Sequence, residues 1–394
     1  MVVAIPVRDE AHHLPACLAA LAAQRGVLPD RVVLLFNNNS DDGPDIVRAL
    51  VPGLPFAVTI AERVYPPEQA HAGTARAEAM RIAATFAGSD GLLLTTDADG
   101  RPDPGWCRAN LAAIDAGAEM VCGRAEIDPV DALAIPALLH EDDAAEVAYG
   151  RQLDEIHALL DPDPADPWPR HTEASGASIA ATVAAWERAG GVPPLPLGED
   201  RAFMRALRRV DGAIRHAPEA VVVVSGRTVG RARGGMAETM ARRIIRQDEE
   251  LDESLEPAAD CCRRARMRAA LRRLHVSGGM DDPRRDASVH RFARISLIDP
   301  RRIAALCELP FFGEAWEAVE RESPSLGRRR VRRAVLERHV ADAERILRSL
   351  RRARAPDALP AAGMLDGALP LGPLNPEAEP WAEPGDQPLE SDRH

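Results

Sequence analysis

The sequence predicts an α/β fold with a mainly parallel sheet, extended by helices and by a tail rich in proline and acidic residues. Short apolar runs alternate with Ala- and Leu-rich stretches over residues 1–125, as in parallel α/β sheets. Polar residues gather where the runs end, and such sheets bind ligands at their strand ends. We expect an α/β domain over 1–235, a helical extension over 236–354 and a disordered tail over 355–394.

Each predicted strand is a short run of apolar and β-branched residues. Runs of this length are typical of buried strands and are shorter than most helices. The first run is closed by Arg8-Asp9-Glu10 and the second by the polar cluster 37–43. The predicted strands cover 2–7, 31–36, 56–61, 91–96, 119–125 and 221–224, with a further short strand after Ser175-Gly176-Ala177.

The predicted helices are longer stretches bounded by capping and turn residues. Glu199-Asp200 opens one helix, because acidic residues are favoured at helix N-termini, and Gly190-Gly191 ends another. The predicted helices cover 14–24, 44–50, 72–86, 105–116, 130–160, 184–189 and 199–210. From about residue 235 to 354 the pattern is helical and charge-rich.

The composition describes an acidic chain that is able to bury a large core. The 394 residues are 46% hydrophobic, and 49 Lys and Arg against 61 Asp and Glu give a net charge of −12. An acidic chain has no general reason to bind nucleic acid, so no such partner is expected. The six cysteines lack the spacing of a zinc site or a disulfide framework, which favours reduced thiols.

The chain shows no sign of membrane insertion or export. No apolar run reaches the length of about 20 residues that a spanning helix needs. The N-terminus lacks the basic region of a signal peptide. We therefore expect a protein with no integral membrane segment and a cytoplasmic location, and the sequence leaves its oligomeric state open.

The strongest local signal is the sequence Asp97-Ala98-Asp99 directly after a predicted buried strand. At a strand end both carboxylates can turn towards one point. Carboxylate oxygens suit a hard cation, so these residues predict a site for Mg²⁺ or Mn²⁺. The alternative is a solvated acidic turn.

Two further segments are candidates for chemistry. Glu199 and Asp200 form a carboxylate pair at a helix start, where one of them can act as a general base on an acceptor hydroxyl or merely cap the helix. In the block 225–235, arginines alternate with glycines after an apolar strand. Arginine forks match phosphate oxygens, so the block predicts a diphosphate site, with a solvated loop as the alternative.

The polar cluster 37–42 lies at the end of the second predicted strand. Its amides and carboxylates are placed to bind a nucleobase or a ribose. The simpler interpretation is that the cluster caps the helix that follows.

Taken in order, these motifs resemble those of glycosyltransferase family 2. The first strand and Arg8-Asp9-Glu10 resemble the family's opening "P-x-x-N/D-E", and the cluster 37–43 resembles "DDGSTDGT" or "NNASTDGT". Gly73-Thr74-Ala75-Arg76 is similar to the start of "G-x-x-x-AR-N". Asp97-Ala98-Asp99 matches the DxD motif, and Glu199-Asp200 the ED motif. The segment from Ser175 to Gly191 resembles the acceptor-side stretch that ends in "GGF".

The resemblance covers about residues 1–235 and implies a GT-A fold, a Rossmann-like nucleotide-diphospho-sugar transferase fold. It implies an inverting, metal-dependent hexosyl transfer from a nucleotide-diphosphate sugar to a hydroxyl acceptor. No membrane helices follow, unlike in the family's processive synthases, and this favours a non-processive transfer. Asp97 and Asp99 would bind the metal, with Asp97 on the ribose side, and Asp200 would be the base beside Glu199. The other implied donor-site residues are Pro6, Arg8, Glu10, Asn38, Asp42 and Arg76, with Arg231 and Arg233 on the diphosphate.

Several departures keep alternatives open. Asn37 and Asn38 replace the family's nucleobase-contacting Asp, Ala77 replaces the Asn of "ARN", and Val192 the Phe of "GGF". The Arg/Gly block is also similar to retaining small-acceptor enzymes such as glucosyl-3-phosphoglycerate and mannosylglycerate synthases. In those enzymes a His joins the metal ligands. His216 would be its counterpart, although a core or surface histidine is the simpler interpretation.

Two other functions fit less well. A nucleotidyltransferase would carry a Gly-rich basic loop after its first strand, and here the segment is Arg8 to His13 without glycine. A non-catalytic sugar-nucleotide binder or scaffold would have no need of the metal carboxylates and the base. The donor sugar, the nucleobase and the acceptor are not determined by the sequence.

Overall fold

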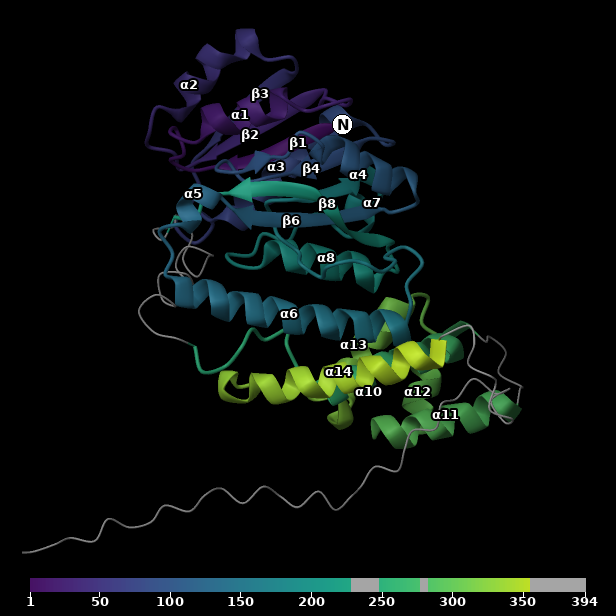
Figure 1. The fold of residues 1–394 in the computed structure, drawn as a ribbon. Coiled ribbons are helices and arrows are strands. Elements are labelled where there is room, and N and C mark those ends of the chain that lie inside the picture. The colour runs from purple at the N-terminus through teal and green to yellow at the C-terminus, as the bar shows by residue number, and fades with distance from the viewer. Residues whose placement is uncertain (228–247, 277–282, 355–394) are drawn as a thin grey trace, which may run out of the picture. The chain divides into compact units, whose positions relative to one another are not determined.

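The computed structural model describes residues 1–227, 248–276 and 283–354, and its eight strands form one sheet (Figure 1). The strand order is β3-β2-β1-β4-β7-β6-β8-β5. The strands are β1 (Val2–Val7), β2 (Arg31–Asn37), β3 (Ala57–Arg63), β4 (Leu92–Thr95), β5 (Arg101–Pro102), β6 (Met120–Ile127), β7 (Ile179–Thr182) and β8 (Ile214–Val224).

Helices separate most of the strands and continue after the last one. The helices before β8 are α1 (Leu14–Ala22), α2 (Gly43–Leu50), α3 (Ala72–Ala87), α4 (Trp106–Asp115), α5 (Pro129–Ala132), α6 (Ala137–Leu160), α7 (Val183–Arg188) and α8 (Glu199–Arg209). Those after it are α10 (Ala258–Val276), α11 (Pro283–Ser296), α12 (Pro300–Cys307), α13 (Phe312–Glu322) and α14 (Leu336–Arg354). Short 3₁₀ turns lie at Val51–Gly53, Pro324–Leu326 and Arg333–Val335.

The sheet has a parallel half and a mixed half. β1 runs parallel to β2 and β4, and β3 runs parallel to β2. β7 is antiparallel to both β4 and β6, while β6 is parallel to β8 and β5 is antiparallel to β8. The predicted α/β class is therefore confirmed. Most of the parallel pairs are formed by β1, β2, β3 and β4, the first four strands along the chain.

Two apolar cores cover the two faces of the sheet. Leu34 belongs to the core that includes Leu18 and Trp106, and its neighbour Leu35 belongs to the core that includes Met80 and Phe203. Successive strand residues point to opposite faces, so a strand covered on both sides must be apolar throughout. This is why the first two strands are visible in the sequence as continuous apolar runs.

β8 begins earlier than the sequence predicts. The expected strand was 221–224, and the observed strand starts at Ile214. His216 pairs with Cys122 and Val221 pairs with Arg124, so the residues between them, including Pro218, form an irregularity in the strand. Charged residues, histidine and proline are uncommon inside a strand. For this reason the sequence did not predict the first half of β8.

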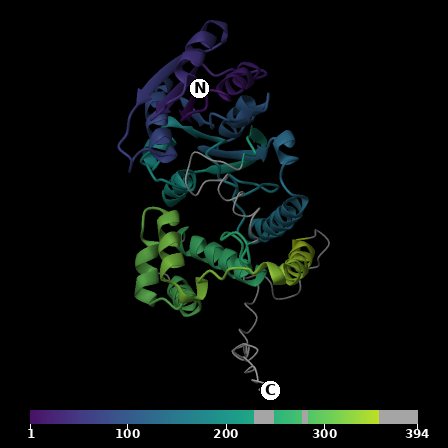
Figure 2. The same ribbon diagram turned by 90° about the vertical axis from the view of Figure 1, so that its left-hand side faces the viewer.

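The described residues from Ala258 to Arg354 are mainly helical and contribute to two further apolar clusters. One cluster includes Leu271 of α10, Ile303 of α12 and Val319 of α13. The other joins Ile156 of α6 and Leu347 of α14 to α10. The helices α11–α13, drawn in green, lie together in Figure 2.

The three-part domain division stays a prediction. Its boundary at 235 and its tail 355–394 lie outside the described residues. The described residues from Met1 to Leu350 belong to one compact unit. Among the described helices none is both long and apolar enough to cross a bilayer. All six cysteines are free and buried, as expected for reduced thiols.

Candidate active site at the ends of the strands

Charged residues from three strand ends meet at one edge of the sheet. β1 and β4 are parallel neighbours, so the residues that follow them emerge at the same edge. Glu10 follows β1, and Asp97 and Asp99 follow β4. β5 begins two residues after Asp99 and pairs with the last part of β8, which brings Arg227 to the same place.

Arg76, in the first half of α3, is the centre of the site. Its Nη2 donates to Asp97 Oδ1 at 2.6 Å, and its Nε donates to Glu199 Oε1 at 3.0 Å. Its Nη1 donates to the Thr95 hydroxyl at 2.8 Å and to the Gly176 carbonyl at 2.7 Å. One guanidinium therefore joins the end of β4, the start of α8 and the segment before β7.

The charge of Arg76 is held by its partners. Burial by itself lowers the pKa of Arg76, but the neighbouring carboxylates of Asp97 and Glu199 outweigh this and raise it above the ordinary value. Arg76 is 4% exposed and Glu199 7%, whereas the Asp97 side chain is 38% exposed. Of these three groups, Asp97 is the one that a ligand can reach.

Asp99 lies in a second cluster with Glu10 and Arg227. The Arg227 guanidinium lies 2.6 Å from Glu10 Oε1 and 2.8 Å from Glu10 Oε2, and 3.2 Å from Asp99 Oδ2. Burial, and then the charge of Asp97, raise the pKa of Asp99 to about 7, although Arg227 opposes this. Burial and the neighbouring carboxylate thus disfavour the charged form of Asp99, and Arg227 favours it.

Asp200 is oriented by backbone donors. Its Oδ2 accepts the Gly176 N–H at 2.8 Å, and its Oδ1 accepts the Arg201 N–H at 2.7 Å. Gly176 also bonds Arg76 through its carbonyl, so Asp200 is linked to the Asp97 network through one residue. A Cβ on Gly176 would lie 2.5 Å from Arg76 Nη2, so only glycine allows this close approach.

In the cluster 37–42 the carboxylate that orders the loop is Asp41. Its Oδ2 accepts the Ala11 N–H at 2.8 Å, and its Oδ1 accepts the Gly43 N–H at 2.9 Å. Asp42 is exposed and makes no side-chain cap at the start of α2. Asn38 bonds the Tyr65 backbone in both directions, at 2.9 and 3.1 Å, which holds the two loops beside β2 and β3 together.

The remaining predicted donor-site residues differ in their placement. Pro6 lies within β1 in register with Leu35, and Arg8 Nη1 donates to the Ala70 carbonyl at 2.9 Å. Arg231 and Arg233 lie outside the described residues. Arg227 was not singled out from the block 225–235, and only its position directly after β8 distinguished it in the sequence.

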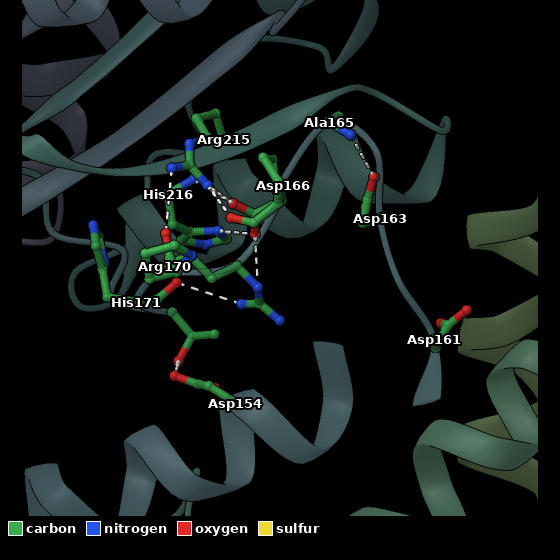
Figure 3. A network of polar contacts seen from close by, with 12 residues as sticks. Asp154, Asp161, Asp163, Ala165, Asp166, Arg170, His171, Arg215 and His216 are labelled. Atoms are coloured by element: carbon green, nitrogen blue, oxygen red, sulfur yellow. Dashed lines mark hydrogen bonds and ion pairs between the residues drawn. The ribbon is translucent and has the colours of Figure 1, made fainter. Parts of the chain in front are cut away.

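His216 is buried and lies near the start of β8, as the simpler interpretation predicts. Its Nδ1 is 2.7 Å from Asp166 Oδ2, and its backbone N–H donates to Asp166 Oδ1 at 2.9 Å (Figure 3). Asp166 also pairs with Arg170 at 3.4 Å and with Arg215 at 3.3 Å. Asp166 therefore supplies the observed partner of this imidazole, and the retaining alternative gains nothing from it.

The carboxylates Asp97, Asp99 and Glu10 are hard oxygen donors, and a guanidinium already occupies the space between two of them. In the described parts of the chain, no three His, Cys, Asp or Glu side chains form a group that would hold a metal ion. Mg²⁺ commonly uses one or two carboxylates together with substrate phosphates, and carboxylates also suit Mn²⁺. The residues therefore fit a cation that is bound together with a diphosphate.

The comparison with protein families identifies the N-terminal part of the chain. Residues 2–141 match the model of the family described as Glycosyl transferase family 2. This part of the chain is a family 2 glycosyltransferase domain. The match confirms the resemblance and the assignment as a glycosyltransferase. It includes Glu10, Arg76, Asp97 and Asp99, while Asp200 lies beyond it.

Solved structures of glycosyltransferases show distant similarity. The TarS protein of S. aureus in complex with UDP-GlcNAc has a TM-score of 0.44 at 13% identity, covering 81% of this chain and 90% of that one. A Pyrobaculum calidifontis mannosyltransferase with GDP-Man and Mn²⁺ has a TM-score of 0.40 at 18% identity, covering 81% and 86%.

Glucosyl-3-phosphoglycerate synthase from Mycobacterium tuberculosis, with Mn²⁺, UDP-glucose and phosphoglyceric acid, has a TM-score of 0.37 at 16% identity. The similarity covers 62% of this chain and 76% of that one. A search of curated protein sequences gave no match. Similarity at this level does not identify the donor or the acceptor of the family 2 domain described here.

Proposed function

We propose that this glycosyltransferase moves a sugar from a nucleotide-diphosphate donor to a hydroxyl acceptor, with inversion, one transfer at a time, and with a divalent cation. The observation that carries the proposal is the network around Arg76. It joins Asp97, at the donor-side strand end, to Glu199 and through Gly176 to Asp200. The proposed metal carboxylate Asp97 and the candidate base Asp200 are thus linked through one hydrogen-bonded network, which fits catalysis by positioning.

The donor half of the site is built from carboxylates that differ in how their oxygens are bonded. Asp97 is fixed through one oxygen by Arg76, which leaves its other oxygen for a ligand. Asp99 and Glu10 face the same guanidinium from two strand ends. When bound, Mg²⁺ or Mn²⁺ would neutralise charge that develops on the leaving diphosphate. Arg8, Asn38 and Asp42 belong in this proposal to the nucleotide side, with Pro6 in the strand below them.

The acceptor half depends on Asp200. Two backbone N–H groups hold its carboxylate in a fixed direction. In the proposed reaction it takes the proton of the acceptor hydroxyl while that oxygen bonds the anomeric carbon and the sugar–phosphate bond breaks. Glu199 is turned towards Arg76 instead, so we assign it a positioning role.

The donor proposal is tested by calorimetric titration with UDP, GDP, TDP and ADP, in Mn²⁺ and in EDTA. We expect one nucleotide to bind at least tenfold more tightly with Mn²⁺, and we expect Asp99→Asn to remove this gain. Asp115→Asn is the matched control, because Asp115 is exposed at the end of α4. Equal binding in Mn²⁺ and EDTA would contradict the metal dependence.

The reaction itself is tested with the sugar conjugates of the nucleotide that binds. Asp200→Asn should lower the transfer rate by about 10²- to 10⁴-fold, the range for loss of a general base, while nucleotide affinity is unchanged. The anomeric configuration of the product, read by proton NMR, checks inversion. A product that retains the donor's configuration would refute the role of Asp200 as base and leave the sugar transfer standing.

A further inference from the structure

Arg227 occupies a position that a metal ion would compete for. Its guanidinium lies between Glu10 and Asp99, at 2.6 to 3.2 Å from their oxygens. Glu10 and Asp99 come from different strand ends, and their side chains are 6% and 14% exposed. One cation therefore partly neutralises two buried carboxylates, and the pair would be strongly unfavourable without it.

The main chain before Arg227 is anchored, so the side chain starts from a fixed point. Asp131 Oδ2 accepts the Gly226 N–H at 2.8 Å and the Ser225 hydroxyl at 3.3 Å. A Cβ on Gly226 would lie 2.7 Å from the Cβ of Asp131, which shows how closely the two segments pack. Arg227 reaches the carboxylates with a long side chain that is 26% exposed.

The charge of Arg227 determines which ligands can bind beside it at Asp99. A divalent ion on Asp99 would lie within a few ångströms of the guanidinium, and two cations at that distance repel each other. A diphosphate removes the conflict, because its oxygens can accept from an arginine fork and bind the metal at once.

On the basis of the proposed function, we propose that Arg227 is an exchangeable cation of the donor site. It pairs with Glu10 and Asp99 when the site is empty and excludes a lone divalent ion from Asp99. It turns to the diphosphate when metal and diphosphate bind together. Arg227 would thereby make metal binding depend on the donor.

The test measures Mn²⁺ binding by electron paramagnetic resonance of the free ion, with inorganic pyrophosphate as the diphosphate probe. Wild type should bind Mn²⁺ weakly alone and at least tenfold more tightly with pyrophosphate. Arg227→Gln should bind Mn²⁺ alone about tenfold more tightly than wild type, and pyrophosphate should then add little. Arg227→Lys keeps the positive charge without the fork and should stay close to wild type for the metal alone.

The control is Arg101→Gln, which removes the same charge two residues from Asp99. Arg101 pairs with Asp128 instead of the site carboxylates, so its variant should match wild type. Circular dichroism checks that each variant is folded. If wild type binds manganese pyrophosphate but Arg227→Gln holds Mn²⁺ no more tightly, the inference is overturned and the proposed function stands. If no form binds Mn²⁺ with or without pyrophosphate, both are overturned.

Discussion

Among the buried charged side chains of the described residues, the networks around Arg76 and around Asp166 are built in opposite ways. Around Arg76, one cation is surrounded by carboxylates, a hydroxyl and a carbonyl. Around Asp166, one carboxylate is surrounded by two arginines and an imidazole (Figure 3). The Asp97 side chain in the first network is 38% exposed, but the Asp166 side chain is only 7% exposed.

We interpret this difference as that between the proposed binding site and a structural network. Both networks shift pKa values, and perturbed pKa values alone do not identify an active site. The first leaves a carboxylate open to a ligand at a strand end. The second is closed, and it ties the segment before β7 to the first half of β8. The predictions below test this contrast, from the largest expected effect to the smallest.

Arg76→Met should have the largest effect on stability, because it leaves Asp97 and Glu199 without their shared cation. Breaking a buried ion pair in this way costs about 3–5 kcal/mol in the free energy of unfolding. We also expect sugar transfer to fall by a factor on the order of 10², since the acceptor and donor halves lose their connection. Urea denaturation and a transfer assay measure the two effects.

The matched control for Arg76 is Arg81→Met on the same helix. Arg81 pairs with Glu78 at the surface, at 2.9 Å, and its side chain is 59% exposed. It should change stability by less than about 1 kcal/mol. Wild-type stability and activity in Arg76→Met would show that the network is not what holds the site together.

Asp166→Asn should lower stability by about 3 kcal/mol while the nucleotide affinity stays at the wild-type value. The amide keeps the shape of the side chain but removes the charge that Arg170, Arg215 and His216 share. Denaturation and calorimetry on the same preparations separate the two quantities. A large loss of nucleotide affinity at full stability would mean that the second network also belongs to the site.

The fold was predictable because its central strands are buried on both faces. The runs at 2–7 and 31–36 are apolar throughout, and they match β1 and β2 closely. β5 has only two residues, and the first half of β8 contains histidine, proline and charges, so neither has a pattern that predicts a strand. The sequence therefore did not predict β5 and the first half of β8, which form by pairing with neighbouring strands and lack an apolar pattern of their own.

The candidate site was predictable to the level of strand ends. Sequence order places Glu10, Asp97 and Asp99 at one edge, but it cannot show which charges pair there. The contact between Arg227 and Glu10 joins residues 217 positions apart. In the same way, sequence order could not show that Asp41, and not Asp42, accepts the Ala11 and Gly43 N–H groups that order the loop after β2.

Acid should weaken the second network through His216 and through His171, whose ring lies 5.6 Å from the ring of His216 (Figure 3). Burial lowers the pKa of His171 to about 4, and it also lowers the pKa of His216. Folding therefore favours the neutral forms of both. For His171 this stability is present above pH 6.5 and is lost as the pH falls from 6.5 towards 4. Asp154 opposes the trend, because burial raises its pKa to about 6 and the folded state then gains protons as the pH falls.

The variant His171→Asn measures how much His171 alone contributes to the pH dependence of stability. Between pH 7.5 and pH 4.5 wild type should lose about 2 kcal/mol more unfolding free energy than the variant does. Urea denaturation at the two pH values measures the difference. Equal losses in both proteins would show that His171 titrates in the folded state as it does in the unfolded chain.

The smallest effect is expected at the surface pair of Arg188 and Glu119. The two side chains meet through two parallel bonds to one carboxylate, at 2.7 and 2.9 Å, whereas Arg76 divides its bonds between Asp97 and Glu199. Yet Arg188 and Glu119 are 36% and 34% exposed, so water already solvates both charges and the pair should contribute about 0.5 kcal/mol. Glu119 also accepts the Ala213 N–H, so a double-mutant cycle of Arg188→Ala with Glu119→Gln is needed to isolate the pair. A coupling energy near that of the buried network would mean that fork geometry, and not burial, sets the strength of these ion pairs.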